Sequence, residues 1–168
     1  MSLNSQPKLY MLCGKIAAGK STLSTKLATR LHTVAISEDA WLARLYKSQI
    51  SSLDDYVFYS AKLRDVVGPH VEDMLRAGLS VVLDFPANTR TQRRWMRQLC
   101  VNANAGHELH FLDTPDEVCR QRLKARNLSG AHNFAATSRD FGIVSGFFEP
   151  PHADEGFEVI RHELMALA

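Results

Sequence analysis

The chain has 168 residues, of which 45% are hydrophobic and 23% are charged, and this composition is typical of one soluble globular domain spanning residues 1–168. It excludes fibrous and disordered proteins. The net charge of +2 is too small to indicate a nucleic-acid partner by itself. No apolar run is long enough to cross a membrane, and the segment from Met1 to Lys8 is polar. The three cysteines lack C-x-x-C spacing, so we expect reduced thiols in a cytoplasmic protein.

The segment from Gly14 to Ser21 reads GKIAAGKS and matches the phosphate-binding pattern G-x-x-x-x-G-K-[ST]. The apolar run Leu9–Cys13 predicts a buried strand before it, and the residues from Ser21 to Leu31 predict a helix after it. In this context the glycines allow several backbone N–H groups to converge at the positive end of the helix dipole. The alternative is an ordinary strand-turn-helix corner with two glycines, which would not explain why motif and flanking pattern agree.

This loop predicts a site for ATP and Mg²⁺. We expect Lys20 to reach the β- and γ-phosphates, the Ser21 hydroxyl to ligate Mg²⁺, and Thr22 to help line the phosphate site. The other residues expected to bind the nucleotide are Gly14, Lys15, Ala17, Ala18 and Gly19.

The rest of the chain alternates between strand and helix patterns. Further strands are predicted at Thr33–Ser37, Ser80–Phe85, Glu108–Leu112 and Phe157–Ile160. Helices are predicted from Ala40 to Tyr46, Leu53 to Val67, His70 to Ala77, Thr91 to Asn104 and Pro115 to Arg126, with Pro69 separating the second from the third. Such alternation is typical of a three-layer α/β/α fold around a parallel sheet. The irregular stretch 127–151, rich in Gly, Pro and Phe, predicts a lid.

Two carboxylates follow predicted strands and are expected to face the phosphate-binding loop, because ligands of open parallel sheets bind beyond the carboxyl ends of the strands. Asp39 is our candidate for the group that accepts or orients the proton of an acceptor hydroxyl; the alternative is an N-cap of the next helix. Asp84 is the candidate for a carboxylate that holds Mg²⁺ through water; the alternative is a cap for the loop after its strand.

Arginines gather in two helices. Arg120, Arg122 and Arg126 precede the expected lid, and Arg122 and Arg126 share one helix face, so we expect these two to contact the transferred phosphate; a solvated basic face is the alternative. The predicted helix from Thr91 to Asn104 carries a second group, Arg90, Arg93, Arg94 and Arg97. We interpret these arginines mainly as the solvated polar side of that helix, with binding of an acceptor phosphate or a nucleic acid as the alternative. The seven histidines show no metal-binding spacing.

Taken together, the sequence resembles the small P-loop kinases grouped with phage polynucleotide kinase, zeta toxins and chloramphenicol phosphotransferase, many of them described as AAA family ATPases. The motifs that carry this resemblance are Gly14 to Thr22, Ser37-Glu38-Asp39, Val81 to Asp84 followed by Asn88-Thr89 and Arg93-Arg94, and Asp113 to Glu117 followed by Arg122-Leu123 and Arg126-Asn127. The resemblance implies a five-stranded parallel sheet in the order 2-3-1-4-5, ATP and Mg²⁺ at the loop, and Asp39 as the acid that activates the acceptor.

The chain departs from the polynucleotide kinases in that group, which carry an arginine three residues after the activating Asp. That position is Leu42 here. We therefore expect an ATP- and Mg²⁺-dependent kinase that phosphorylates a hydroxyl of a small molecule, with a 5′-hydroxyl polynucleotide end as the alternative acceptor. A second alternative is an ATP-binding switch module that has no acceptor. No feature of the sequence indicates an oligomeric state.

Overall fold

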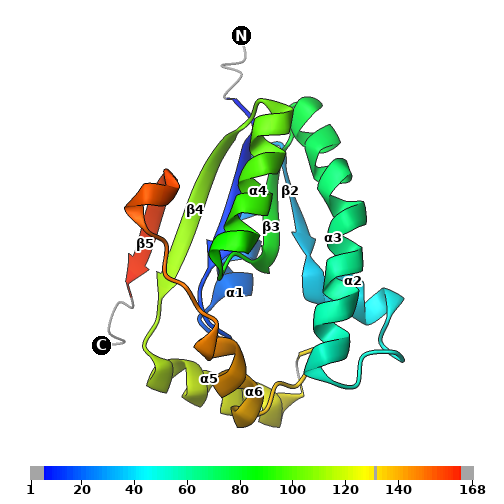
Figure 1. Cartoon of the computed structure of the whole chain (residues 1–168), viewed down its shortest axis with the longest axis vertical. Coiled ribbons are helices and arrows are strands. Elements are labelled where there is room, and N and C mark those ends of the chain that lie inside the picture. Colours follow the sequence, from blue (N-terminus) through cyan, green and yellow to red (C-terminus); the bar gives the residue numbers. More distant parts are fainter. Residues whose placement is uncertain (1–5, 131, 164–168) are drawn as a thin grey trace.

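The computed structural model describes residues 6–130 and 132–163; the polar N-terminal residues 1–5 lie outside this part, as does residue 131 of the expected lid. Five parallel strands form one sheet in the order β2-β3-β1-β4-β5 (Figure 1), which confirms the strand order expected from the resemblance. The strands are β1 (Lys8–Cys13), β2 (Thr33–Ser37), β3 (Ser80–Pro86), β4 (Gly106–Asp113) and β5 (Val159–Glu163).

The helices are α1 (Lys20–Leu27), α2 (Glu38–Leu45), α3 (Leu53–Arg76), α4 (Arg90–Ala103), α5 (Asp116–Ser129) and α6 (Ser138–Gly146), with one 3₁₀ turn at Ala153–Glu155. In Figure 1, α3 and α4 cover one face of the sheet and α1 lies behind the other. Helices α5 and α6 lie beyond the carboxyl ends of the strands. The fold is therefore the three-layer α/β/α arrangement of P-loop NTPases, with two helices placed across the end of the sheet where ligands bind.

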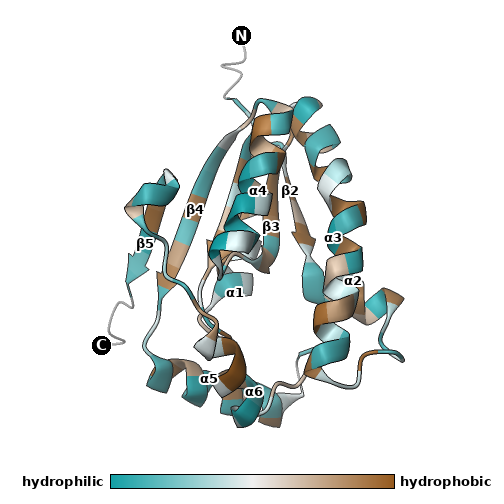
Figure 2. Ribbon diagram, in the orientation of Figure 1, coloured by the Kyte–Doolittle hydropathy of each residue, from teal (hydrophilic) through white to brown (hydrophobic). Residues whose placement is uncertain are grey.

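Both faces of the central strand β1 are buried, and its side chains alternate between two cores. Leu9 and Met11 pack with residues of β3, α3 and α4, whereas Tyr10 and Leu12 pack with Leu27 of α1. This alternation follows from the two-residue period of a strand. The neighbouring strand β3 is largely apolar, whereas the ribbon of α5 is mostly hydrophilic (Figure 2).

Helix α3 is one continuous helix, so the prediction that Pro69 divides it is wrong. A proline removes one backbone hydrogen bond, here the one to the carbonyl of Asp65. Pro69 and Asp65 are both exposed, so water can satisfy that carbonyl. On the opposite side Val67 and Val71 are completely buried, and their packing carries the helix through the proline.

Helix α1 ends at Leu27 rather than at Leu31, because Leu31 is 84% exposed and has no core to pack against. The stretch 127–151 is also more regular than predicted. Helix α5 extends into it, and it contains α6, which begins with a capping box between Thr137 and Asp140. That capping pattern is the reason why a helix forms there.

The predicted solvated side of the α4 arginines is wrong for Arg93, which is 0% exposed. Its guanidinium donates two hydrogen bonds to the carboxylate of Glu155, at 2.7 and 2.9 Å, and others to the carbonyls of Ala87 and Glu149, at 3.0 and 2.8 Å. Arg97 donates to the carbonyls of Glu155 and Gly156. These arginines therefore hold the segment before β5 against α4. Among the described residues, no helix combines the length and apolar character needed to span a bilayer.

Candidate functional site

The loop between β1 and α1 has the backbone that a phosphate cradle requires. A Cβ at Gly14 would lie 3.1 Å from both the Ala18 Cβ and the Leu112 carbonyl oxygen, so any larger residue would crowd these neighbours. Gly19 has a φ of 109° and immediately precedes α1, a backbone conformation that side chains disfavour. The first N–H groups of a helix have no partner within it, and the dipole gives them a partial positive charge. They are therefore suited to bind an anion.

Lys20 is the first residue of α1, and its side chain folds back across the phosphate-binding loop. Its ammonium donates to the carbonyls of Gly14, at 2.5 Å, and Lys15, at 2.8 Å. Burial lowers the pKa of Lys20, while the nearby carboxylates of Asp84 and Asp39 act in the opposite direction. The lysine thus braces the loop and places its Nζ at the cradle.

Two neighbouring segments hold the loop from outside. The Asn88 side chain, after β3, accepts a hydrogen bond of 2.9 Å from the Gly14 N–H. Arg122 of α5 donates to the Ala18 carbonyl at 3.3 Å. The Lys15 side chain pairs with Asp116 and lies over the Phe148 ring. Lys15 and Gly14 are not among the residues that line the cavity described below.

Asp84 near the end of β3 and Ser21 in the first turn of α1 lie side by side. Burial raises the pKa of Asp84, and the Ser21 hydroxyl and the Lys20 ammonium oppose that rise. No cluster of three His, Cys, Asp or Glu side chains that could hold a metal occurs in residues 6–130 and 132–163. A hydroxyl and one carboxylate nevertheless fit Mg²⁺, which keeps several waters and takes phosphate oxygens for its other ligands.

Asp39 lies in the first turn of α2 and is not the N-cap, because the Ser37 hydroxyl accepts the capping bond from Ala40 N–H. Tyr56 of α3 places its hydroxyl 2.6 Å from Asp39 Oδ1 and 3.0 Å from Glu38 Oε2. Burial raises the pKa of Glu38, opposed by Arg64, whose guanidinium lies 3.4 Å away. Since one phenol carries one proton, Tyr56 donates to one of the two carboxylates at a time.

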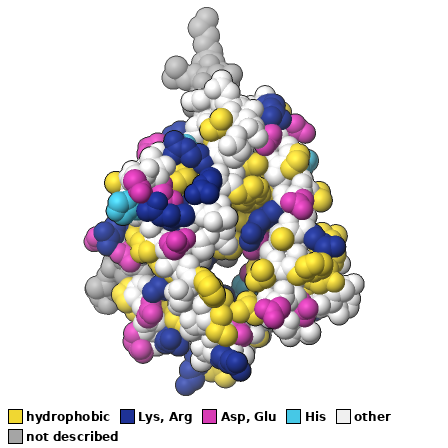
Figure 3. All heavy atoms as spheres, viewed as in Figure 1, with side chains coloured by type: hydrophobic (Ala, Val, Ile, Leu, Met, Phe, Trp, Pro, Cys, Tyr) yellow, Lys and Arg dark blue, Asp and Glu magenta, His cyan; other side chains and the backbone are white. Residues whose placement is uncertain are grey.

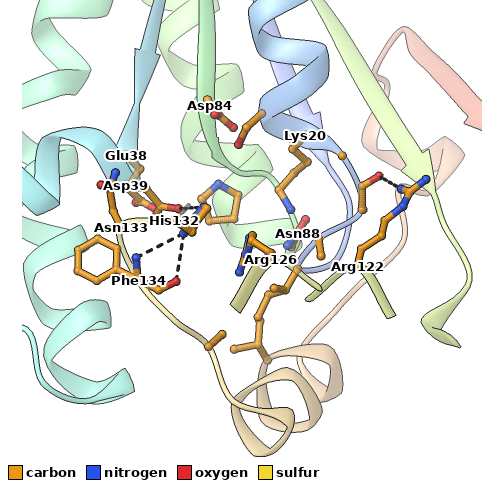
Figure 4. Close-up of a pocket in the computed structure, with 18 of the residues that line it drawn as sticks. Lys20, Glu38, Asp39, Asp84, Asn88, Arg122, Arg126, His132, Asn133 and Phe134 are labelled. Atoms are coloured by element: carbon orange, nitrogen blue, oxygen red, sulfur yellow. Dashed lines mark hydrogen bonds and ion pairs between the residues drawn. The ribbon is translucent and has the colours of Figure 1, made fainter. Parts of the chain in front are cut away.

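One cavity of about 1370 Å³ is lined by the functional side chains described above, namely Lys20, Ser21, Glu38, Asp39, Tyr56 and Asp84. Figure 3 shows the molecule hollowed between the sheet and the α5–α6 region, and Figure 4 shows Lys20, Asp84 and Asp39 around the same space. The cavity is bounded by the phosphate-binding loop on one side and by α2 and the start of α3 on the other. It is therefore large enough to hold a nucleotide and a second small molecule together.

Arg126 reaches into this cavity from α5 (Figure 4). Burial lowers the pKa of its guanidinium, and the Asp39 carboxylate opposes this effect. Its buried Nε has no hydrogen-bond partner within the described structure. Arg122, on the same helix face, also lines the cavity but is tied to the loop. A guanidinium whose Nε has no partner beside a phosphate cradle is a donor that a phosphoryl group would satisfy.

Residues 9–151 match a protein family described as AAA domain, a family of P-loop kinases. The chain belongs to this AAA domain family. No curated protein is significantly similar to it in sequence.

Solved structures with the same fold include kinases. A Chloroflexus aurantiacus protein to which a kinase function is attributed has a TM-score of 0.77 and 21% identity, over 96% of this chain and 87% of that one. Kti12 of Chaetomium thermophilum, in complex with ADP-AlF3, has a TM-score of 0.72 and 15% identity, over 94% and 89%. APS kinase CysC of Mycobacterium tuberculosis, in complex with AMPPNP and APS, has a TM-score of 0.59 and 16% identity, over 95% and 90%. At these identities the similarity shows that this AAA domain chain has the P-loop kinase fold.

The structure brings most of the residues selected from the sequence together at this cavity: Ala17, Ala18, Gly19, Lys20, Ser21, Thr22, Asp39, Asp84, Arg122 and Arg126. Sequence patterns predict no role at the site for four further side chains that line the cavity, namely Glu38, Tyr56, Asn88 and His132. Glu38 and Asn88 carried a signal, since both stand among the family motifs, after β2 and after β3. Tyr56 and His132 carried none, because their place depends on how α3 and the segment after α5 pack.

Proposed function

We propose that this AAA domain protein is an ATP- and Mg²⁺-dependent kinase that transfers the γ-phosphate to a hydroxyl of a small molecule. The observation that carries the proposal is that one cavity holds the phosphate-binding loop and, on its opposite wall, the Asp39 carboxylate. Phosphoryl transfer needs a phosphate cradle, a metal, cations on the moving charge and a group that orients the attacking hydroxyl. The chain has a candidate for each.

Each residue is assigned a role from its position. The N–H groups of the loop and the Lys20 ammonium bind the β- and γ-phosphates, and Ser21 and Asp84 would hold Mg²⁺. Mg²⁺ neutralises charge on the phosphates when bound. Arg126, with its free Nε, stabilises the charge on the transferred group, and Arg122 assists from the same helix face. Asp39 orients the acceptor hydroxyl and accepts its proton as the oxygen–phosphorus bond forms.

The acceptor side of the cavity favours a small molecule over a polynucleotide end. Leu42, where the polynucleotide kinases carry an arginine, is 0% exposed and packs in the core. Arg44 is exposed on α2 and does not line the cavity. The lining at this end carries the acids Glu38 and Asp39 together with Lys47. A polynucleotide backbone is normally bound by several Lys and Arg side chains.

A screen with γ-labelled ATP tests the proposal. Sugars, nucleosides, hydroxylated metabolites and antibiotics, and 5′-hydroxyl oligonucleotides would be offered to the wild type, to Asp39→Asn, and to Asp65→Asn as a control on the exposed side of α3. We expect label on a small hydroxylated compound, a loss of about 10²- to 10⁴-fold in Asp39→Asn, and normal turnover in Asp65→Asn.

Three other outcomes contradict parts of this proposal. Label on oligonucleotides alone, with a steep loss of binding as salt increases, would make the acceptor a nucleic acid. ATP hydrolysis without transfer to any compound would favour the switch module. Full transfer by Asp39→Asn would remove Asp39 as the base.

A further inference from the structure

The segment of residues 132–137 touches the carboxylate that the proposed function uses as a base. His132 Nε2 lies 3.4 Å from Asp39 Oδ2, and both side chains are largely shielded, with 25% and 33% exposed. The other ring nitrogen, Nδ1, lies 3.4 Å from the Phe134 backbone N–H, from which it can accept, and 3.1 Å from the Phe134 carbonyl oxygen. Figure 4 shows the imidazole directed at Asp39.

The two oxygens of Asp39 are thus engaged by two different elements. Tyr56 of α3 lies 2.6 Å from Oδ1, and His132 lies beside Oδ2. A carboxylate oxygen can accept about two hydrogen bonds, so Oδ2 keeps room for an acceptor hydroxyl. Contacts on both oxygens fix the plane of the carboxylate, which is the requirement for a base that must meet a hydroxyl in one direction.

The same segment also joins the two sides of the cavity. The Phe134 ring meets the Tyr56 ring edge-on, at 5.5 Å between centroids and 85° between planes. At its other end, the Ala136 carbonyl accepts a 2.7 Å hydrogen bond from Asn127 of α5. Helix α5 carries Arg126, so the segment connects the helix that holds the phosphate-side arginine to the helices that hold Asp39 and Tyr56.

We infer that His132 is a positioning residue that orients Asp39 and couples the docking of residues 132–137 to the alignment of the base. This inference rests on the proposed kinase function. In the docked segment the His132 ring holds Nε2 beside the carboxylate, and Asp39 then faces the acceptor hydroxyl with a defined direction. When the segment leaves α2 and α3, Asp39 keeps only the Tyr56 contact and the transfer step slows.

Two substitutions test whether the contact with Asp39 is needed or whether any polar side chain at position 132 is enough. His132→Gln carries an amide N–H at about the reach of Nε2, whereas the amide of His132→Asn reaches only as far as Nδ1. We expect His132→Asn to lower kcat about 10- to 100-fold, with KM for ATP changed less than about two-fold, because the defect is one of alignment at the acceptor. His132→Gln should recover most of kcat. The acceptor is the compound labelled in the screen, or water if ATP hydrolysis alone is seen.

Trypsin cleavage gives a second readout that does not depend on activity. Loss of the contact should raise the cleavage rate after Arg126 and Arg139 about 2- to 5-fold in His132→Asn but not in His132→Gln, with AMPPNP and Mg²⁺ present. Thermal unfolding of each variant confirms that it is folded. In the Asp39→Asn background, the His132→Asn change should lower kcat no further, because the carboxylate that His132 orients is already lost.

Equal kcat and equal cleavage rates for wild type and His132→Asn would overturn the inference and leave the proposed function intact. So would a His132→Asn effect that persists at full size in Asp39→Asn, because His132 would then act without Asp39. Full transfer by Asp39→Asn alone would instead contradict the proposed function, while the cleavage rates would still decide whether the His132 contact docks the segment.

Discussion

The backbone N–H of Gly14 donates a 2.9 Å hydrogen bond to the side-chain oxygen of Asn88, and this contact joins the start of the phosphate-binding loop to the end of β3. Asn88 is itself held on both sides. Its N–H donates to Gln92 in the first turn of α4, and its carbonyl accepts from the Glu149 N–H at 2.8 Å. The loop is therefore anchored to the sheet and, through Asn88, to the segment that follows α6.

We predict that Asn88→Ala weakens binding of AMPPNP with Mg²⁺ about 3- to 10-fold. The buried Gly14 N–H would lose its partner, and leaving such a donor unsatisfied costs about 1 kcal/mol or more. Calorimetric titration measures the affinity. Asn102→Ala is the control, because Asn102 is an exposed amide near the end of α4, where it contacts Glu72. Equal affinities for wild type and Asn88→Ala would mean that the loop keeps its shape without this contact.

Sequence patterns predicted the elements that local physics determines. The phosphate-binding loop, the five strands and the alternation with helices each have a period or motif within a short stretch, and β2 was placed at its observed residues, Thr33–Ser37. The candidate carboxylates Asp39 and Asp84 were found because parallel strands bring their carboxyl ends to one edge. Strand order depended on resemblance to known kinases, since no local pattern specifies it.

Several features that the sequence patterns missed or mispredicted depend on contacts between distant segments. Nothing near Arg93 indicates that Glu155, 62 positions later, enters the core beside it. Pro69 normally ends a helix, and only the packing of α3 on the sheet shows why it does not. His132 lies in an irregular stretch, and its approach to Asp39 depends on the path of the chain after α5.

Lys20→Ala should weaken binding of ATP with Mg²⁺ strongly and abolish turnover. The lysine is the only side chain of the loop whose charge lies at the cradle in the described structure, and it also braces the carbonyls of Gly14 and Lys15. Calorimetry and a γ-labelled ATP assay measure both effects. Lys124→Ala, an exposed position on α5, is the control. Normal affinity together with normal rates in Lys20→Ala would contradict the whole assignment of the loop.

Arg126→Lys should lower turnover at least about 10-fold while it changes the affinity for AMPPNP little. A lysine keeps the charge but loses the forked donors that the guanidinium offers to a phosphoryl group. The control is Arg120→Lys, because Arg120 lies over the Phe141 ring at 4.4 Å and does not line the cavity. Turnover measured at saturating ATP distinguishes the two variants. A loss shared equally by both would indicate a general effect of changing α5.

Arg93→Met should lower the free energy of unfolding by about 3 kcal/mol or more, because it leaves the Glu155 carboxylate, 8% exposed, without its bidentate partner. Arg94→Met, one position later and exposed, should stay within about 0.5 kcal/mol of the wild type. Urea unfolding followed by circular dichroism gives both values. Replacing Glu155 by Met as well should restore part of the loss. An Arg93→Met protein as stable as Arg94→Met would show that the Arg93–Glu155 pair does not contribute to the free energy of unfolding.

The histidine pair between β4 and β5 predicts a loss of stability at mildly acidic pH. His110 is 2% exposed, and its Nδ1 lies 2.9 Å from His162 Nε2. Burial lowers the pKa of His110; His162 and Arg30 lower it further, and Glu108 opposes them. Burial also lowers the pKa of His162, with a contribution from Lys26. The fold therefore favours the neutral form of both imidazole rings.

The sign follows from linkage. A histidine whose pKa is lower in the folded state contributes its full stability above the ordinary value of 6.5, and that stability is lost as the pH falls below it, because the unfolded chain takes up the proton first. The free energy of unfolding should therefore decrease between pH 7 and pH 5. His107 acts in the same direction, and Glu38, whose pKa burial raises, acts in the opposite one.

Comparison with variants isolates the contribution of His110. His110→Gln should show a smaller decrease from pH 7 to pH 5 than the wild type, and His70→Gln, an exposed position on α3, should match the wild type. Urea unfolding at each pH supplies the free energies. The difference between variants cancels the effects of His107 and Glu38, which all three proteins share. Identical pH dependence in His110→Gln and the wild type would mean that His110 has the same pKa in the folded and the unfolded chain.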